Sequence, residues 1–338
     1  MQIRQIDIAK QLNVTRMTVS KALRDHSDIS HEMKEKVRGV AKELGYIPNR
    51  MASQLQNKKS HTIGVVIPDI SNSFFSYTVH GIMDAAEHHG YDIIMAGSRE
   101  SERVEKNNIF KLLSLQVDGI LVAVSTHTTD REIFEIVKRT KTPLVFFDRS
   151  IKDAGFSCVG IDNVQAAFKL VSFVIQQGYT KIAHLGGYSD FSVAKMRCEG
   201  YRKALAENNI PVNNDWIIKE MFDRNSGYKG FKKLFSLENK PEVIFAANDI
   251  IAQGTYDAAR EAGIRIPEDL GIVAFGHHEF ATFLYPTLTV IDGSPKAVGQ
   301  KALNLLVEEI GTSGKTIAQN VHLQAEIEIN QSLRLKSQ

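Results

Sequence analysis

The sequence is short of the features that mark secreted, membrane-spanning and metal-dependent proteins. Its N-terminus, MQIRQIDIAK, is charged and polar where a secretory signal needs an apolar segment, and no apolar run approaches the roughly 18 residues of a membrane helix. Only two cysteines occur, Cys158 and Cys198, and their spacing matches no zinc motif. These absences predict a cytoplasmic protein without membrane association, with no bound metal and with cysteines that serve packing.

Motifs of the common enzyme classes are missing as well. The glycine pair in HLGGYSD follows an apolar run, but it lacks the spacing of the dinucleotide fingerprint and of the phosphate-binding loop with its lysine. The chain has no nucleophile elbow and no His/Glu zinc pattern. We therefore expect a protein that is not an enzyme and needs no cofactor.

Charge, by contrast, is concentrated at one end of the chain. Residues 1–60 carry 12 Lys and Arg against 6 Asp and Glu, which leaves 29 against 33 in the rest of the sequence. A basic N-terminal segment on a mildly acidic body indicates contact with a polyanion. A solvated helical surface would give the same imbalance, so charge alone leaves both readings open.

The basic segment has the pattern of three short helices. Apolar residues recur at helical spacing in IRQIDIAKQLNV, in TRMTVSKALRD and in the stretch after Ser30. Thr15 is a favourable N-cap for the second helix, and Asn13 tolerates the left-handed backbone that a tight turn between helices requires. Gly45 is placed to end the third helix. Three short helices with a tight first turn are typical of a helix-turn-helix.

In a helix-turn-helix the first residues of the second helix face the major groove of DNA. Arg16 can donate two hydrogen bonds to guanine and Met17 can pack on a thymine methyl, whereas threonine and lysine side chains suit phosphates. A small helical bundle with no nucleic-acid role is the alternative. The predicted DNA-contacting residues of this helix are Thr15, Arg16, Met17, Thr18, Ser20 and Lys21.

A second candidate DNA-binding element follows in YIPNRMASQLQNKKS. Pro48 would end the third helix, and NRMASQLQN is compatible with a helix of about two turns, which is marginal in isolation. We expect it to fold only when a partner copy and DNA hold it. Leu55 is apolar in an otherwise polar segment, as a wedge in a minor groove would be, although it could also be incidental in a linker.

Together these motifs resemble the LacI/GalR family of bacterial transcription regulators. DIAKQLNVTRMTVSKAL is similar to the DNA-binding headpiece of that family and YIPNRMASQL to its hinge helix, and the resemblance extends over essentially the whole chain. It implies a homodimer whose recognition helices read two half-sites of a near-palindromic operator in double-stranded DNA. The paired hinge helices would insert Leu55 at the central step, with minor-groove contacts from Asn49, Arg50 and Ala52.

From residue 61 onward, short apolar runs alternate with longer amphipathic stretches. Runs such as TIGVVIP, YDIIMAG and PLVFFD are typical of buried strands, and segments such as 75–89, 164–177 and 249–262 are typical of helices. This alternation predicts parallel sheets covered by helices on both faces. The strands fall into two similar halves, so we expect two doubly wound subdomains in tandem, with the C-terminal tail crossing back between them.

The predicted fold is an N-terminal all-α helix-turn-helix headpiece with a hinge helix, followed by an α/β periplasmic-binding-protein-like effector domain of two doubly wound parallel-sheet subdomains. The likeness to the periplasmic sugar-binding fold is part of the family resemblance. The expected divisions are a headpiece at 1–48, a hinge helix and linker at 49–60, and an effector-binding and dimerisation domain at 61–338, with a first subdomain at about 61–161 plus 293–320 and a second at about 162–291 plus 321–332.

Ligands of such sheets bind beyond the carboxyl ends of the strands, where this chain places polar and aromatic residues. Carboxylates, guanidinium groups and amides form bidentate hydrogen bonds with vicinal hydroxyls, and aromatic faces stack on sugar rings. By resemblance, all but the last two residues below match the pentose- and hexose-binding pattern of the periplasmic fold. The candidate effector-binding residues are Asn72, Phe74, Phe75, Asp148, Arg149, Arg197, Phe222, Asn248, His277 and Asp292.

The adjacent histidines in VAFGHHEFATF invite a metal-binding or catalytic interpretation. His277 and His278 would point to opposite faces if the strand continued, which disfavours one shared metal, and no catalytic motif lies beside them. Relatives commonly have a sugar-binding aspartate where this chain has Gly276. Either Asp292 takes over hydroxyl binding, or the vacated position, with His277 nearby, admits a bulkier or anionic ligand such as a sugar acid.

The resemblance thus implies a sequence-specific DNA-binding transcriptional regulator, expected to act as a repressor and to be controlled by a small carbohydrate-type effector. The effector would bind in the cleft between the two subdomains. A catabolite-control-type regulator whose main effector is a phosphocarrier protein is the alternative within the family. A transport-associated sugar-binding protein fits less well, because the chain adds a basic segment of about 60 residues and lacks a signal sequence.

Overall fold

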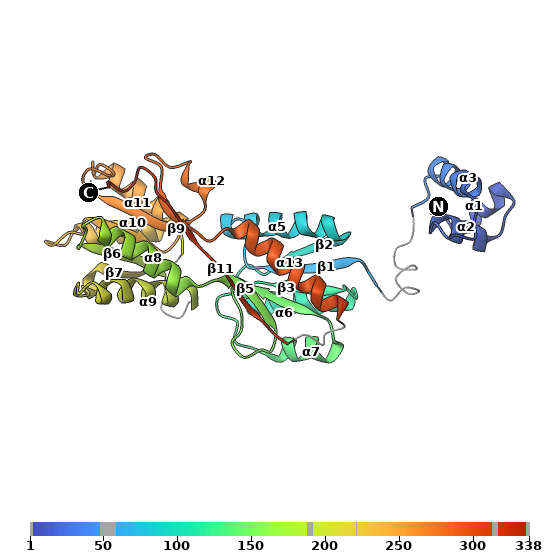
Figure 1. The fold of residues 1–338 in the computed structure, drawn as a ribbon, viewed down its shortest axis with the longest axis horizontal. Coiled ribbons are helices and arrows are strands. Elements are labelled where there is room, and N and C mark those ends of the chain that lie inside the picture. The colour runs from blue at the N-terminus through green and yellow to red at the C-terminus, as the bar shows by residue number, and fades with distance from the viewer. Residues whose placement is uncertain (1–2, 48–58, 188–191, 221, 313–316, 336–338) are drawn as a thin grey trace. The chain divides into compact units, whose positions relative to one another are not determined.

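The computed structural model describes residues 3–47, 59–187, 192–220, 222–312 and 317–335. The chain forms two compact units (Figure 1), each with a buried core of its own. They comprise Met1–Ser60 and His61–Gln338.

The first unit contains the three helices that the sequence predicts. The Thr15 hydroxyl caps the second of them by accepting a hydrogen bond from the backbone N–H of Thr18 at 3.1 Å. Asn13 has φ 51° and ψ 44°, so the first turn uses the left-handed conformation expected of it. The helices are α1 Gln5–Leu12, α2 Arg16–Leu23 and α3 His31–Glu43. The apolar residues buried between them are Ile8, Ala9, Val19, Ala22, Val37 and Ala41.

Two six-stranded sheets form the second unit, with the strand orders β11-β5-β4-β3-β1-β2 and β12-β10-β9-β8-β6-β7. Among the described strands, every pairing is parallel except that of β10 with β12. The strands of the first sheet are β1 Thr62–Ile67, β2 Asp92–Gly97, β3 Gly119–Val122, β4 Leu144–Phe147, β5 Ser157–Ile161 and β11 Asn320–Leu323. Those of the second are β6 Ile182–Gly187, β7 Ile217–Glu220, β8 Val243–Ala246, β9 Gly271–Gly276, β10 Thr289–Asp292 and β12 Glu326–Glu328.

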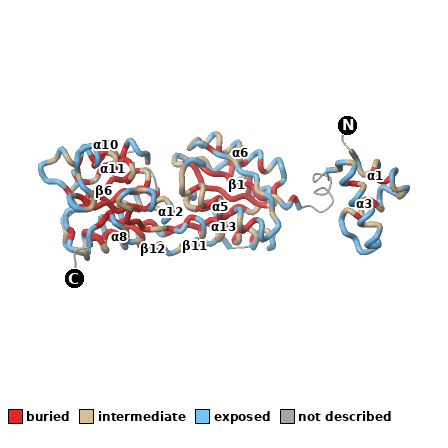
Figure 2. Tube along the Cα trace, turned by 90° about the horizontal axis from the view of Figure 1, so that it is seen from above, coloured by how far each residue is buried: buried red, intermediate tan, exposed pale blue. Residues whose placement is uncertain are grey.

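Helices cover both faces of each sheet, as parallel sheets require, and the central strands form the buried interior (Figure 2). In the first subdomain α5 and α13 pack on one face and α6 and α7 on the other. In the second, α8 and α9 lie opposite α10 and α11. The helices are α5 Ser73–His89, α6 Glu102–Ser114, α7 Glu132–Thr140, α8 Asn163–Gln176, α9 Ser192–Glu207, the 3₁₀ turn η1 Asn214–Trp216, α10 Arg224–Phe235, α11 Asp249–Glu261, α12 His278–Ala281 and α13 Pro295–Gly311.

Strand β2 corrects one detail of the sequence analysis. The run YDIIMAG does form a strand, but it is not buried: β2 lies at the edge of its sheet, and Ile94 and Met95 are 39% and 46% exposed. An edge strand lacks a neighbour on one side, so apolar composition alone does not bury it. The first subdomain therefore presents an apolar edge.

The chain passes between the two sheets three times. It leaves the first sheet after β5, returns to it after β10, and crosses again in the two residues between β11 and β12. The last crossing follows Leu323, three residues beyond the expected boundary at 320, because β11 pairs with β5 along its whole length. These crossings place the carboxyl ends of both parallel sheets on either side of one cleft.

Candidate ligand cleft and nucleic-acid interface

Helix α2 exposes the side chains that the sequence assigns to base reading. Met17 is 65% exposed, and Arg16 is exposed without an ion pair to any described residue. Both lie in the first turn of the helix, beside the capping residue Thr15. An exposed methionine next to an exposed arginine offers an apolar and a bidentate polar contact, which suits direct readout in a major groove.

The other predicted contacts of α2 already have partners within the unit. The Lys21 ammonium pairs with Asp28 at 2.8 Å, and Ser20 accepts a hydrogen bond from Arg24 at 2.9 Å. The hydroxyls of Thr15 and Thr18 lie 2.9 Å apart. These side chains would have to exchange or share their partners to reach phosphates. The predicted hinge contacts Asn49, Arg50, Ala52 and Leu55 lie outside the described residues.

Nine of the ten predicted effector-binding residues line one cavity in the second unit. Its volume is about 650 Å³, including the part that is open to solvent. The lining residues are Asn72, Phe74, Phe75, Asp148, Arg149, Ile161, Val193, Arg197, Phe222, Asn248, Asp249, Phe275, Gly276, His277, Gly293 and Pro295. The cavity lies at the carboxyl ends of strands from both sheets, where the chain crosses between them.

Two asparagines enter the cavity as helix N-caps. The side-chain oxygen of Asn72 accepts a hydrogen bond from the backbone N–H of Phe74 at 3.0 Å, which caps α5. Asn248 does the same for α11 through the N–H of Ile251, at 2.8 Å. Each cap uses the amide oxygen and leaves the amide nitrogen as a donor for a ligand hydroxyl.

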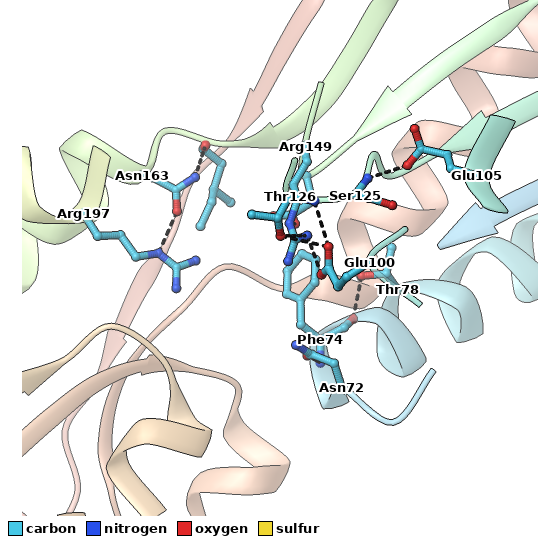
Figure 3. A network of polar contacts seen from close by, with 12 residues as sticks. Asn72, Phe74, Thr78, Glu100, Glu105, Ser125, Thr126, Arg149, Asn163 and Arg197 are labelled. Carbon is cyan, nitrogen blue, oxygen red and sulfur yellow. Dashed lines mark hydrogen bonds and ion pairs between the residues drawn. The ribbon is translucent and has the colours of Figure 1, made fainter. Parts of the chain in front are cut away.

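Arg149 is fixed on one wall of the cavity by several partners (Figure 3). Its guanidinium donates to Glu100 at 2.8 Å and to the hydroxyl of Thr126 at 3.3 Å, and it lies 5.2 Å from the ring centre of Phe75. Its neighbour Asp148 has φ 59°, a left-handed conformation that aspartate tolerates better than most residues. The carboxylate partner holds the arginine for directed hydrogen bonding.

Arg197 occupies the opposite wall, on α9. Its Nε donates to Asn163 at 2.9 Å (Figure 3), another of its nitrogens donates to the carbonyl of Ala247, and its guanidinium lies 3.8 Å from the ring centre of Phe275. Burial lowers the pKa of Arg197 to about 10, opposed by Asp148 and Asp249. A guanidinium held this firmly is preorganised to bind a ligand oxygen.

The two carboxyl groups of the cavity, Asp148 and Asp249, both have pKa values that burial raises. Burial raises the pKa of Asp148, although Arg149 and Arg197 act in the opposite direction. Burial also raises the pKa of Asp249, whose carboxylate accepts a hydrogen bond from the Ser73 hydroxyl at 3.2 Å. Ser73 belongs to the first subdomain and Asp249 to the second, so this bond joins the two walls.

His277 contributes a buried imidazole at the cavity wall. Its Nδ1 accepts a hydrogen bond from the backbone N–H of Phe280 at 3.4 Å, which makes it the N-cap of α12. Burial lowers its pKa, opposed first by Asp249, so the neutral ring carries its proton on Nε2. That nitrogen is buried and has no hydrogen-bond partner among the described residues. It can donate to a ligand oxygen.

Asp292 is the predicted residue that does not line the cavity. Its carboxylate accepts hydrogen bonds from the backbone N–H groups of Ser294 at 2.6 Å and His278 at 3.3 Å. It therefore shapes the turn into α13, and the neighbouring Gly293 and Pro295 line the cavity instead. This placement offers no direct support for hydroxyl binding by Asp292.

The adjacent histidines have separate roles because the strand ends before them. β9 stops at Gly276, and His278 is exposed in α12, where its Nδ1 lies 2.7 Å from Glu328. A Cβ at Gly276 would lie 2.9 Å from Val290, so an aspartate there would require the neighbouring side chain to shift. No group of three or more His, Cys, Asp or Glu in the described part of the chain is arranged to hold a metal.

Seven further residues line the cavity without belonging to the predicted set. Asp249 follows the predicted Asn248 at a strand end, whereas the other six are apolar or small and carry no local chemical signal, so only the tertiary fold brings them to the site. The seven residues are Ile161, Val193, Asp249, Phe275, Gly276, Gly293 and Pro295. None of the described helices is long and apolar enough to span a membrane.

A helix-turn-helix unit with an exposed recognition helix, joined to two parallel-sheet subdomains with a polar and aromatic cleft between them, fits a DNA-binding transcription regulator with a sugar-binding type of domain. Residues 6–49 match the model for bacterial regulatory proteins of the lacI family, and residues 60–331 match the model for periplasmic binding proteins and the sugar binding domain of the LacI family. The chain belongs to the LacI family.

Curated relatives and solved structures are similar along most of the chain. The HTH-type transcriptional repressor CytR of Escherichia coli (strain K12) is 31% identical over 90% of this chain and 89% of its own. Catabolite control protein A of Priestia megaterium is 31% identical over 97% and 98%. The transcription regulator CcpA of Lactococcus lactis superposes with a TM-score of 0.73 at 26% identity, covering 81% of this chain and 99% of that one. The lac repressor dimer bound to operator and the anti-inducer ONPF gives 0.87 at 24% identity, covering 99% and 100%.

Proposed function

We propose that the protein is a sequence-specific transcriptional repressor, without enzymatic activity, that is controlled by a small carbohydrate-type effector in the cleft. The observation that carries this proposal is the gathering of nine predicted side chains in one cavity. Two fixed guanidinium groups, two amide caps and three phenylalanines supply the hydrogen-bonding and stacking groups that suit a sugar ring. The similarity to the ribose operon repressor of Escherichia coli (strain K12), 28% identical over 90% of this chain, supports it.

The proposed mechanism uses the two subdomains, with boundaries close to those expected from the sequence, as a hinged pair. Contacts across the cleft hold one orientation: Ser73 with Asp249, and the ring of Tyr77 against His277 at 4.2 Å between ring centres. The Tyr77 hydroxyl also donates to Glu279, which raises its pKa. A ligand that favours one orientation shifts the population of the two.

The first subdomain is the part that would transmit this shift towards DNA. Its β1 begins at Thr62, directly after the first unit ends at Ser60, so rotation of this subdomain moves the attachment point of the hinge segment. A two-turn helix is marginal in water and responds to such a change by folding or melting. Operator affinity then depends on the ligand.

We also propose that the active protein is a homodimer. The apolar edge of the first subdomain supports this, because the edge strand β2 exposes Ile94 and Met95, and α5, which contacts that strand, exposes 54% of Met83. Exposed apolar surface gathered at one edge is typical of an interface.

A thermal-shift screen of sugars, sugar acids and sugar phosphates tests the carbohydrate assignment. A ligand at one hundred times its dissociation constant stabilises the protein by about 2.7 kcal/mol, which raises the melting temperature measurably. A genuine cleft ligand loses its effect in Arg149→Gln and keeps it in Lys203→Gln, since Lys203 lies outside the cavity. If no compound of the panel stabilises the protein, the carbohydrate assignment is wrong.

The 31% sequence identity to catabolite control protein A supports keeping the second candidate that the family resemblance implies, in which a phosphocarrier protein is the main effector. In that case operator binding responds to the protein partner and to none of the sugars. Affinity capture with the full-length chain as bait, followed by an operator-binding assay with the captured protein, separates the two candidates. A sugar response in operator binding without any protein partner supports the first.

A further inference from the structure

A second cavity lies in the second subdomain, apart from the candidate cleft. It is formed by β6, β7 and α9, and its volume is about 760 Å³ including the part open to solvent, similar to that of the cleft. His184 and Gly186 of β6 line it together with Lys195 and Arg202 of α9 and Lys219 of β7. None of these residues belongs to the cleft, so the proposed effector does not account for them.

His184 is the residue that points to a ligand. It is fully buried, and its Nδ1 donates to the carbonyl oxygen of Phe245 at 3.0 Å. Its ring stacks against Phe245 and Tyr201, with 4.7 Å and 5.4 Å between ring centres. Burial lowers the pKa of His184 to about 4, so at neutral pH the ring is uncharged and Nε2 is a hydrogen-bond acceptor. No described residue donates to it. A buried acceptor without a donor is costly unless something else supplies one.

Gly186 lies directly against this nitrogen. A Cβ at Gly186 would lie 2.7 Å from His184 Nε2, which is too close for a carbon atom, so a side chain here would press on the ring and cover its lone pair. The backbone φ of Gly186 is outside the left-handed region, so the conformation does not itself require glycine. Both residues line the cavity. Glycine at this position therefore keeps the unpartnered nitrogen free of a covering side chain at the cavity wall.

The basic side chains around the cavity favour an anionic ligand. Lys195 and Arg202 lie on α9 and Lys219 on the neighbouring β7, and Glu199 is the one carboxylate among the described residues that line the cavity. The three basic side chains are exposed at the rim, whereas Ala194 and Ile217 add apolar surface to the wall. A small molecule with a negative group at the rim and a donor at the buried end satisfies both features.

We propose that this cavity is a second ligand site, for a small organic carboxylate or phosphate that also carries a hydroxyl or N–H donor. The anionic group binds among Lys195, Arg202 and Lys219, and the donor binds His184 Nε2 beside Gly186. The proposal does not rest on the function proposed for the cleft. The two sites share α9, which carries Arg197 to the cleft and Cys198 to the second cavity.

Cys198 provides a reporter for occupancy in the full-length protein. It lines the second cavity and is half-buried, whereas burial raises the pKa of Cys158, the other cysteine, to about 11 and keeps it as an unreactive thiol. The rate at which a thiol reagent labels Cys198, in a Cys158→Ser background, is measured with three anions and their uncharged analogues. The pairs are 4-hydroxybenzoate with 4-hydroxybenzamide, 3-hydroxybutyrate with 1,3-butanediol, and glycerol phosphate with glycerol.

The proposal expects at least one anion to slow labelling while its uncharged analogue does not. Replacing Lys195 and Lys219 by Gln raises the concentration needed for protection by about tenfold, the scale of a charge-assisted hydrogen bond. Lys203→Gln, on the same helix but packed on Phe168 at 4.9 Å, leaves it unchanged. Arg149→Gln, in the cleft, leaves it unchanged too.

Gly186→Ala tests the buried half of the site, with circular dichroism as a check on folding. Loss of protection in a folded Gly186→Ala protein supports the assignment of His184. The proposal is overturned if none of the anions protects Cys198, if the uncharged analogues protect it equally, or if the lysine double variant leaves protection unchanged. The lysine variants are at the surface and keep the test decisive should Gly186→Ala fail to fold.

Discussion

At the scale of single residues, α2 divides its predicted DNA contacts into two kinds. Arg16 is exposed with no described ion-pair partner, whereas Lys21 is held by Asp28 at 2.8 Å. The first can read a base edge directly, and the second must exchange its carboxylate for a phosphate. Base contacts carry sequence preference and phosphate contacts carry affinity, so the two positions differ in what a substitution removes.

We predict that Arg16→Ala relaxes base preference at one position of the selected site, with a loss of about 1–3 kcal/mol there. Lys21→Ala weakens binding to all sequences alike, and it reduces the slope of log affinity against log salt concentration by about one. Asp28→Asn removes the carboxylate that holds Lys21, so we expect it to increase DNA affinity at low salt. Fluorescence anisotropy over a salt series and a set of single-base variants measures all three. Equal effects of Arg16→Ala on every sequence would contradict the assignment.

The pH dependence of ligand binding tests His277. Burial lowers its pKa, while Asp249, Asp292, Glu279 and Glu328 act to raise it, so the ring is neutral at pH 7. An anionic ligand beside Nε2 favours the protonated ring, and we therefore predict that affinity for a sugar acid rises as pH falls from about 8 to 5.5.

Titration calorimetry at several pH values provides the measurement. His277→Asn keeps the helix cap and removes the titrating group, so it flattens the profile. Asp249→Asn serves as the control, because burial raises the pKa of that carboxyl and it interacts electrostatically with His277. Binding of neutral monosaccharides alone, without pH dependence, would leave the anionic-ligand hypothesis without support.

At the scale of helices and strands, close helix packing depends on glycine at particular crossings. Helices α10 and α11 approach so closely that a Cβ at Gly254 would lie 1.8 Å from the carbonyl oxygen of Arg224. The reverse contact, from Gly227 to the carbonyl of Ile251, is 2.0 Å. Neither backbone oxygen can move without displacing its helix.

Gly254→Ala should therefore destabilise the second unit by roughly 1–3 kcal/mol or more, because the two helices must separate. Gly311→Ala is the matched control: it lies in a helix of the same unit, meets nothing within 4 Å, and should be neutral or slightly stabilising. Urea unfolding of both variants gives the comparison. Equal stabilities would mean that the helices can separate at little cost.

The spacing of apolar residues predicts most of these helices and strands, but it misses helices whose sequence lacks a clear apolar pattern. The helices expected at 75–89, 164–177 and 249–262 appear within two residues as α5, α8 and α11. Periodicity does not predict α10, which is rich in lysine and glycine, or α13, which lies in the part of the chain expected to return to the first subdomain. The single turn of α12 begins at the N-cap residue His277. No pattern in VAFGHHEF predicts this cap, because it depends on tertiary structure.

In the cleft, too, some residues can be predicted from the local sequence and others only from the tertiary structure. Asn72, Asp148 and Asn248 were predictable because strand ends in a doubly wound sheet meet at one edge. Asp292 also follows a strand, yet its carboxylate binds two backbone N–H groups and stays out of the cavity. Which strand-end carboxylate faces the ligand and which holds a turn depends on backbone geometry beyond the reach of residue spacing.

At the scale of the whole molecule, the exposed apolar edge predicts how the chain assembles. Met95 on the edge strand β2 is 46% exposed, and a buried apolar interface would cover it. Met95→Glu should shift the protein from dimer to monomer in sedimentation velocity at micromolar concentration. Lys111→Glu, on α6 and exposed, is a control for the added charge and should leave the dimer intact. Dimerisation that survives Met95→Glu unchanged would place the interface elsewhere.

The proposed coupling between the cleft and DNA is reciprocal by thermodynamic necessity. The most direct test takes a near-palindromic site selected by the protein from random double-stranded DNA and the strongest ligand from the carbohydrate screen. Operator affinity is measured with and without ligand, and ligand affinity with and without operator. We predict the same change in both affinities, about 5- to 150-fold, and the loss of that change in Arg149→Gln. A ligand that occupies the cleft and leaves operator affinity unchanged would contradict it.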